Sequence, residues 1–346
     1  MTEEKAHVFA FDEEKVMKQL GKEKLLSLFE KMLFIRIFEA RAENAYLQGK
    51  IGGFFHSYAG QEAIQTASVA VFGLNNWYTT TYRCHALAIL LGEDPKGLMA
   101  EFFGKESGNV KGRGGSMHLF SDRMLGGLAI VGGHIPIATG AAFSLKYQQK
   151  KGEFSICFLG EGAVAQGSFY ESLNLASLWN LPCVYVVENN KWGMGTNVEK
   201  AIAPLPIGEK FGLLYNMKSL TLDGMDLLAC IAGFVEAKNE MQKNERPILI
   251  EAVTERFRGH SISDPGLYRT KEELKRIQKK DPIEQMKQRL LSCQFLNQEE
   301  LQAMEEKIKK EVKDAEVFAD QSPFPNPVTL EEGVFAEKRG LCDTER

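Results

Sequence analysis

The chain has 346 residues, 44% of them hydrophobic and 25% charged, with a formal net charge of −4 at pH 7. This length allows one large core or two modest ones, of which we expect one, and the evenly mixed charges exclude the basic surface that nucleic-acid binding needs. The first residues, Met1-Thr2-Glu3-Glu4-Lys5, form neither a secretory signal nor an Arg-rich transit peptide, so we expect a cytoplasmic protein.

The N-terminal part of the chain predicts helices. Residues Lys22 to Gln48 place apolar side chains along one side of a long helix, which Gly49 ends. Shorter elements are expected after it: a helix at 61–72, a strand or extended arm at 77–81 and a helix at 95–103. A Gly-rich segment then runs from residue 104 to residue 133.

Residues Gly126 to Leu145 carry no Lys, Arg, Asp or Glu, and the stretch is long enough to raise the idea of a membrane span. Its glycines and Pro136 argue against a regular membrane helix. We therefore expect a buried loop that enters a helix at Pro136, and no membrane association.

The middle of the chain alternates strands and helices. Apolar runs at 154–159, 183–187 and 247–253 predict buried strands, and a helix is expected at about 168–179. This alternation predicts an α/β fold with a doubly wound parallel sheet. We divide the chain into an N-terminal helical arm (1–50), the α/β region (51–269) and a C-terminal helical extension (270–346) within one integrated domain. The extension is charged, breaks at Asp281-Pro282 and becomes Pro-rich after Asp320.

Polar residues follow two of these strands. Gly160-Glu161-Gly162 follows the first, and Glu188-Asn189-Asn190 follows the second. Carboxyl ends of parallel strands meet at one edge of a sheet, where open α/β sheets bind ligands. Glycines on both sides of Glu161 let backbone amides approach an anion, and Glu161 and Asn190 offer oxygen ligands that suit magnesium. The pattern predicts a diphosphate and metal site, although Glu161 could instead cap the following helix.

This layout resembles the thiamine diphosphate motif, which begins Gly-Asp-Gly and ends Asn-Asn; here Glu161 replaces the aspartate. Further segments occur in the same order as in one family: Tyr82 to His85, Gly112 to His118, Ile130 to Gly133, Glu188 to Thr196 and Arg258 to Gly266. The chain thus resembles alpha subunits of the decarboxylating first component of pyruvate dehydrogenase, in the thiamine diphosphate-dependent 2-oxo acid dehydrogenase family. The resemblance implies the thiamine diphosphate-binding fold.

The resemblance assigns roles to individual residues. It implies a magnesium ion bound by Glu161, the Asn190 side chain and the Trp192 carbonyl. It implies cofactor contacts from Tyr82, Arg83, Ala129, Val131, Gly160, Glu161, Gly162, Ala163, Asn190, Arg256 and His260. His260 is expected to assist catalysis, and His56 to lie with Phe54 and Tyr58 where substrate enters and to be the second catalytic residue. A weaker cofactor role is expected for His85, none for His118 or His134, and a turn-forming role for Asn189.

The implied reaction is oxidative decarboxylation of pyruvate with reductive acetylation of a lipoyl group on a dihydrolipoyl acyltransferase. Because the residues after Thr270 predict no second sheet, a separate beta subunit in an α2β2 heterotetramer should complete the site. A branched-chain 2-oxo acid or acetoin dehydrogenase alpha subunit is the alternative within this family, and a non-catalytic scaffold is the alternative outside enzymes. A nicotinamide dehydrogenase is disfavoured, because the 160–165 segment lacks the third glycine of that motif.

Three further expectations concern Ser261, the loop that contains it and the cysteines. Ser261 matches a serine that kinases phosphorylate in mitochondrial members of the family, but we expect it to be unmodified here. The loop from Arg258 to Gly266 carries charge suited to phosphate and little apolar surface, so we expect it to be mobile without cofactor and ordered with it. The six cysteines are scattered without the close pairs of a metal site, and we expect reduced structural thiols.

Overall fold

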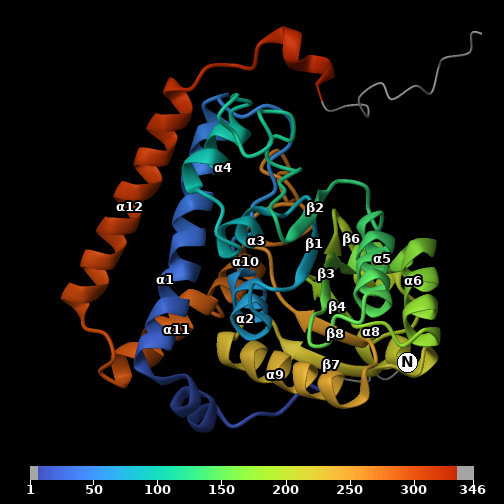
Figure 1. Cartoon of the computed structure of the whole chain (residues 1–346). Coiled ribbons are helices and arrows are strands. Elements are labelled where there is room, and N and C mark those ends of the chain that lie inside the picture. The colour runs from blue at the N-terminus through green and yellow to red at the C-terminus, as the bar shows by residue number, and fades with distance from the viewer. Residues whose placement is uncertain (1–6, 333–346) are drawn as a thin grey trace, which may run out of the picture.

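A computed structural model describes residues 7–332 and places a six-stranded sheet at the centre of the molecule (Figure 1). All neighbouring strands are parallel, in the order β2-β1-β3-β4-β8-β7. The strands are β1 (Trp77–Thr81), β2 (Met124–Leu128), β3 (Ser155–Gly160), β4 (Cys183–Asn189), β7 (Lys218–Asp223) and β8 (Ile248–Val253), with β5 (Trp192–Gly193) and β6 (Thr196–Asn197) forming a short antiparallel pair. The predicted α/β parallel sheet is confirmed.

Helices cover both faces of the sheet. They are α1 (Glu13–Leu47), α2 (Glu62–Phe72), α3 (His85–Leu90), α4 (Pro95–Phe102), α5 (His134–Tyr147), α6 (Gly167–Leu178), α7 (Val198–Ala201), α8 (Ile207–Leu214), α9 (Leu227–Asn244), α10 (Lys271–Gln278), α11 (Pro282–Ser292) and α12 (Gln298–Gln321), with short 3-10 turns η1 (Glu161–Ala165) and η2 (Pro327–Glu331). Alternate residues of β3 enter different cores: Ile156 and Phe158 pack with α2 and α9, whereas Cys157 and Leu159 pack with α5, α6 and α8. The sheet is therefore doubly wound.

The N-terminal helix is longer than the sequence predicted. It starts after Asp12, whose side chain accepts a hydrogen bond from the Lys15 amide, and it is interrupted at Gly21, whose φ of 72° and ψ of 167° are not helical. The predicted start at Lys22 marks the residue after this interruption, so the turns from Glu13 onward were missed. α1 and α12 run side by side along one flank, and their buried side chains join the same core as α2 and α9 (Figure 1).

The uncharged segment differs from its prediction. Met124–Leu128 is the edge strand β2, paired with β1, and not a buried loop; α5 begins at His134, two residues before Pro136. A Cβ atom on Gly127 would lie 2.6 Å from the Cys84 sulfur, so glycine lets this strand pack closely. Across residues 7–332, every helix is too short or too polar for a membrane span.

The Gly-rich segment is organised around the buried carboxylate of Glu101, on α4. Its Oε2 accepts hydrogen bonds from the amides of Val110 (2.9 Å) and Gly112 (2.8 Å), and its Oε1 accepts from those of Gly114 (2.7 Å) and Gly115 (3.1 Å). These bonds satisfy donors that a loop of this composition cannot pair with itself. The segment thereby holds a fixed path toward Ser116 and Met117.

The C-terminal extension is helical, as predicted, and breaks where Asp281 caps α11. Beyond α12, the Arg113 side chain donates to the carbonyls of Thr329 and Glu332, joining the end of the described chain to the Gly-rich segment. Cys84, Cys157, Cys183 and Cys230 are buried free thiols and Cys293 is exposed. Cys342 and the rest of the predicted extension after Glu332 lie outside the described residues, as do Met1 to Ala6 of the N-terminal arm.

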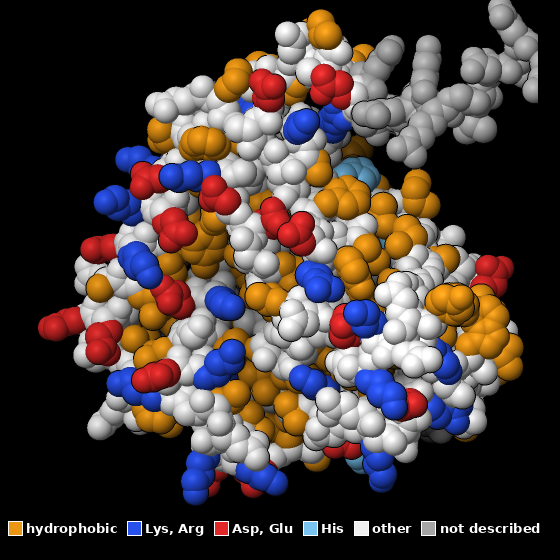
Figure 2. All heavy atoms as spheres, viewed as in Figure 1, with side chains coloured by type: hydrophobic (Ala, Val, Ile, Leu, Met, Phe, Trp, Pro, Cys, Tyr) orange, Lys and Arg blue, Asp and Glu red, His pale blue; other side chains and the backbone are white. Residues whose placement is uncertain are grey.

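The two sides of the molecule differ in surface character. Figure 2 shows acidic and basic side chains along the α12 side, whereas hydrophobic side chains gather over the α5 and α6 side. On the outer face of α5, Ile137, Phe143 and Tyr147 are exposed, with Trp179 beside them after α6. Exposed apolar patches of this kind usually mark protein interaction sites.

Candidate active site

A cavity of about 440 Å³ opens at the carboxyl ends of β1, β3 and β4. Apart from His85, the residues expected from the sequence to have a catalytic, cofactor or metal role all line it: His56, Tyr82, Arg83, Ala129, Val131, Gly160, Glu161, Gly162, Ala163, Asn190, Trp192, Arg256 and His260. These residues come from six separate stretches of the chain, so the fold brings them together as the sequence predicted.

Glu161 lies at the first position of η1, directly after β3, and is almost wholly buried. Its Oε2 accepts a hydrogen bond from the Asn190 amide at 3.2 Å. Burial raises the pKa of Glu161, while backbone hydrogen bonds and the charges of Arg256 and Arg83 oppose that rise. Gly162 approaches Gly193 so closely that a Cβ on either would meet the other's Cα at 3.6 Å. This packing fixes Glu161 against the Asn190 turn.

The Asn190 turn presents two more oxygen atoms. Asn190 Oδ1 and the Trp192 carbonyl both accept hydrogen bonds from Arg256 Nη1, at 3.2 Å and 2.9 Å. Asn189 stabilises the turn, as predicted, because it accepts from the Lys191 amide and donates to Glu251. Two of the three groups proposed as metal ligands therefore already bind a cationic side chain in this structure, and together with Glu161 they form a donor set that fits a hard divalent ion.

Two guanidinium groups give the cavity a positive interior. Arg83 and Arg256 are 5% and 1% exposed, and within the described residues neither hydrogen-bonds a carboxylate. Arg83 instead donates to the carbonyls of Ser57 and His260, both at 2.8 Å. Burial and the neighbouring Arg256 lower the pKa of Arg83 to about 10, which leaves it charged at neutral pH. Two buried cations without hydrogen-bonded carboxylates fit an anionic ligand such as a diphosphate.

Two histidines and Tyr82 form the opposite wall. The ring of His56 lies 4.3 Å from that of Tyr82 and 5.0 Å from that of His260. Burial, followed by the charge of Arg83, lowers the pKa of His56 to about 2 and that of His260 to about 4. Both imidazoles are neutral at pH 7, and their buried Nδ1 atoms have no hydrogen-bond partner among the described residues. A neutral imidazole can donate a proton to a ligand or accept one from it.

Glu188 is a cavity residue to which the sequence assigned no role. Its side chain is buried and accepts hydrogen bonds from the Tyr58 hydroxyl and from Gln65 Nε2, the latter at 3.3 Å. Burial raises its pKa to about 7, against the hydrogen bond from Tyr58 and the charge of Arg83. The signal for Glu188 was its place at the end of a buried strand, where a carboxylate has no packing role.

Glu188 should make stability depend on pH. In the unfolded protein this carboxyl group releases its proton near pH 4.5, and in the folded protein near pH 7. Its contribution to the free energy of unfolding is therefore complete below pH 4.5 and is lost as the pH rises through 7. Glu188→Gln keeps an acceptor for Tyr58 but cannot titrate. Between pH 4.5 and pH 8 we expect its free energy of unfolding to rise by about 3 kcal/mol relative to that of the parent. Urea unfolding at several pH values measures this. Parallel pH profiles for the two proteins would show that Glu188 titrates normally.

Several residues expected near the cavity do not line it. Phe54 is exposed, and Tyr58 lies below the cavity with its hydroxyl on Glu188. His85 is fully buried, with Nδ1 2.9 Å from Glu39 Oε1 and Nε2 2.8 Å from the Ser116 carbonyl, so it supports the fold instead of a ligand. Arg258, the first residue of the loop expected to carry phosphate-binding charge, does not line the cavity; its Nε donates to both oxygens of Glu43 at 3.0 and 2.9 Å.

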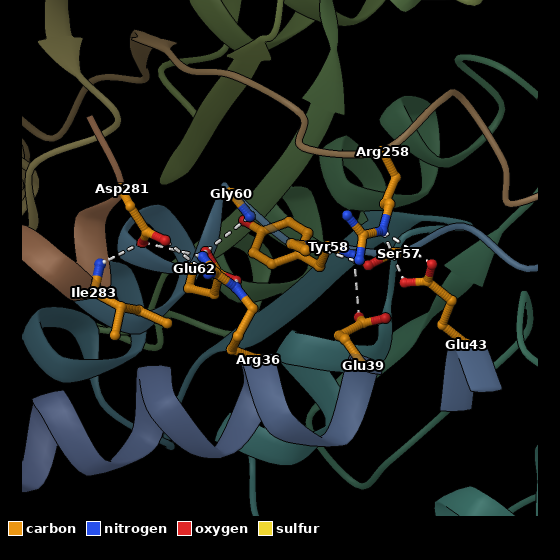
Figure 3. Close-up of polar contacts among 11 residues, drawn as sticks. Arg36, Glu39, Glu43, Ser57, Tyr58, Gly60, Glu62, Arg258, Asp281 and Ile283 are labelled. Atoms are coloured by element: carbon orange, nitrogen blue, oxygen red, sulfur yellow. Dashed lines mark hydrogen bonds and ion pairs between the residues drawn. The ribbon is translucent and has the colours of Figure 1, made fainter. Parts of the chain in front are cut away.

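One face of α1 binds the segments that lead to two cavity residues, His56 and His260 (Figure 3). Arg36 binds Glu62 and Asp281, Glu39 accepts from the Tyr58 amide at 3.1 Å, and Glu43 binds Arg258. Successive members of this row are three and four residues apart, so they share one side of the helix. The row fixes the segment before α2 and the segment after β8, which carry His56 and His260.

We still predict that the loop that carries His260 becomes more ordered when the cofactor binds. In the structure, Asp264 accepts from the His260 amide at 2.6 Å and from the Tyr268 hydroxyl at 2.7 Å. We expect amides of residues 258–266 to exchange hydrogen more slowly when thiamine diphosphate and magnesium are present, since the cofactor would add contacts to His260. Hydrogen exchange with amides of β3 as an internal reference measures this. Equal protection in both conditions would contradict the coupling.

Comparisons with known proteins give a consistent result. Residues 30–328 match the family described as dehydrogenase E1 component. The chain is 41% identical over 316 residues to the pyruvate dehydrogenase E1 component subunit alpha of Rickettsia bellii, covering 89% of this chain and 95% of that protein. It is 39% identical over 326 residues to the protein of that name from Porphyra purpurea, covering 92% and 94%. It is also 39% identical to the chloroplastic subunit alpha-3 of Oryza sativa, covering 92% and 77%.

Proposed function

Because this chain belongs to the dehydrogenase E1 component family, we propose that it is the alpha subunit of a thiamine diphosphate-dependent pyruvate dehydrogenase. It would take part in oxidative decarboxylation of pyruvate and reductive acetylation of a lipoyl group on a dihydrolipoyl acyltransferase. The observation that carries this proposal is the pair of buried arginines, Arg83 and Arg256, facing Glu161 and Asn190 in one cavity. That arrangement supports a diphosphate held with a divalent ion.

The residues divide the work by chemical type. Arg83 and Tyr82 would hold the diphosphate, together with backbone amides of Gly160, Gly162 and Ala163. Glu161, Asn190 and the Trp192 carbonyl would hold magnesium, while Ala129 and Val131 would contact the aminopyrimidine ring. Thiamine diphosphate, when bound, supplies the electron sink that decarboxylation requires.

The neutral histidines are placed to handle protons. His56 and His260 face the same space across 5.0 Å, and the low pKa of each keeps a lone pair available at neutral pH. His260 would donate or accept the proton that acyl transfer requires, and His56 would orient the 2-oxo acid by a hydrogen bond. The apolar wall at Met117 and Leu128 would keep water away from these groups.

The cavity is open on the side of Ile130 and Val131, which are 77% and 48% exposed. α5, which carries the exposed apolar side chains Ile137, Phe143 and Tyr147, begins shortly after Val131, and this supports a protein partner on this side. We propose that a beta subunit covers this side, supplies a carboxylate for the cofactor and forms an α2β2 heterotetramer. The described residues form one large sheet, and thus offer no second α/β unit to do so.

The purified chain alone should therefore show no 2-oxo acid decarboxylation with thiamine diphosphate and magnesium. Reconstitution with a beta chain encoded beside it should restore turnover, and kcat/KM should be higher for pyruvate than for 2-oxoisovalerate or acetoin. Robust turnover by the isolated chain would refute the need for a partner. A tenfold preference for either competitor, about 1.4 kcal/mol, would assign the chain to a branched-chain or acetoin enzyme instead.

A non-catalytic scaffold remains the reading outside enzymes, and the replacement of the usual aspartate by Glu161 is the feature that favours it. Calorimetry separates the two functions. An active subunit in the α2β2 complex should bind thiamine diphosphate in a magnesium-dependent manner, whereas a scaffold should show no such dependence.

A further inference from the structure

The Arg256 side chain makes the contacts that a bound cation would make. It follows β8, is 1% exposed, and directs Nη1 to both Asn190 Oδ1 and the Trp192 carbonyl. Its Nη2 donates to the Met194 carbonyl at 3.3 Å and to the Tyr268 hydroxyl at 2.7 Å. One guanidinium is therefore held by the two oxygens that, with Glu161, form the proposed metal site.

Arg256 and a divalent ion would compete for these oxygens. Each of these oxygens has two lone pairs, and Arg256 Nη1 uses one of them on each, so the guanidinium occupies part of the space that a magnesium ion with short, near-octahedral bonds would need. Two cations at adjacent positions in a buried cavity would also repel each other strongly. Because arginine keeps its charge at all accessible pH values, only movement of the side chain can release the oxygens.

Two observations favour that movement when an anion is present. Arg256 Nε is buried without a hydrogen-bond partner among the described residues, so the guanidinium is not fully satisfied where it lies. Arg83 lines the same cavity, and burial, followed by the charge of Arg256, lowers the pKa of Arg83 to about 10. An anion entering between them would attract both guanidinium groups and draw Arg256 away from the Asn190 turn.

We propose that Arg256 competes with the divalent ion: its guanidinium hydrogen-bonds the Asn190 and Trp192 oxygens until an anionic ligand draws it away. This rests on the proposed function for the identity of the anion, a diphosphate, but the competition itself concerns residues of this chain alone. By linkage, an anion that attracts Arg256 raises the affinity for the metal, and the metal raises the affinity for the anion by the same factor. The ion alone should bind weakly.

Manganese binding to the full-length chain, followed by the electron paramagnetic resonance of free Mn²⁺ with no thiamine diphosphate present, tests the competition. We expect Arg256→Gln to bind Mn²⁺ at least tenfold more tightly than the parent. Arg256→Met keeps the volume of the buried stem and should behave alike, so it carries the test if the glutamine variant does not fold.

Arg83→Gln is the matched control. It removes a buried positive charge from the same cavity but leaves the Asn190 and Trp192 oxygens bound by Arg256. Because it removes repulsion but frees no ligand oxygen, we expect it to raise Mn²⁺ affinity less than either Arg256 variant does. If Arg83→Gln and Arg256→Gln raise the Mn²⁺ affinity equally, the cause is the loss of any positive charge from the cavity and not the release of the ligand oxygens. If Mn²⁺ binding is unchanged or weaker in both Arg256 variants, Arg256 stabilises the site instead of competing with the ion. Either result overturns the proposal. Failure of the α2β2 complex to bind thiamine diphosphate would refute the proposed function while leaving this result intact.

Discussion

Glu161→Gln should weaken magnesium-dependent binding of thiamine diphosphate to the assembled complex at least 100-fold, or about 2.8 kcal/mol, and reduce turnover accordingly. Glu161 is the carboxylate directly after β3 and is 2% exposed, against the Asn190 turn. An amide keeps the size of this side chain but removes the negative charge that a hard divalent ion prefers. Isothermal calorimetry with and without magnesium measures the loss.

Two companion variants sharpen this test. Glu161→Asp restores the shorter carboxylate usual in the motif and should keep or tighten cofactor binding, because the charge stays. Glu171→Gln removes an exposed carboxylate from α6 and should leave binding unchanged. If Glu161→Gln also binds and turns over normally, Glu161 caps η1 and the metal assignment is wrong.

Glu101→Gln should destabilise the protein by at least about 3 kcal/mol, since a buried carboxylate that accepts four backbone N–H groups would be replaced by an amide that presents its own donors. The loss should also loosen residues 108–118 and, through Met117, the wall of the cavity. Urea unfolding measures the stability, and hydrogen exchange of the Gly112 to Gly115 amides locates the effect.

Glu106→Gln provides the comparison, because Glu106 is an exposed carboxylate in the same segment. Its unfolding free energy should stay within about 0.5 kcal/mol of the parent. If Glu101→Gln is equally mild, then the four hydrogen bonds contribute little and the Gly-rich segment is fixed by packing, for example by the close contact of Gly108 with the Glu101 backbone.

The sequence predicted the elements whose signal is local. β3 and β4 are continuous apolar runs, and Glu161 and Asn190 follow their ends, so strand position and site position could be read together. β2 was missed because its residues, Met124 to Leu128, include two glycines and lack the β-branched side chains typical of strands. β7 and α9 were missed because residues 218–244 carry no motif that singled them out.

Other features depend on contacts between distant residues, and no local pattern encodes them. Arg258 and Arg256 are two positions apart in the same loop, yet Arg258 pairs with Glu43 while Arg256 enters the cavity. His85 follows Tyr82 and Arg83, which are expected to bind the cofactor. Its ring instead pairs with Glu39 on α1 and is buried in the core. Which partner each charged side chain finds is decided by tertiary packing.

The charged face of α1 also sets the order in which the molecule can be completed during synthesis. Arg36 meets Asp281 across 245 positions and Glu43 meets Arg258 across 215, so this helix leaves the ribosome long before its partners exist. Contacts of such sequence separation form late in folding, because the intervening chain must first be closed into a loop. The cavity behind α1 should therefore stay unfinished in nascent chains until translation has passed the Asp281-Pro282 break, and a chain arrested before that point should gain no ligand-dependent resistance to proteolysis.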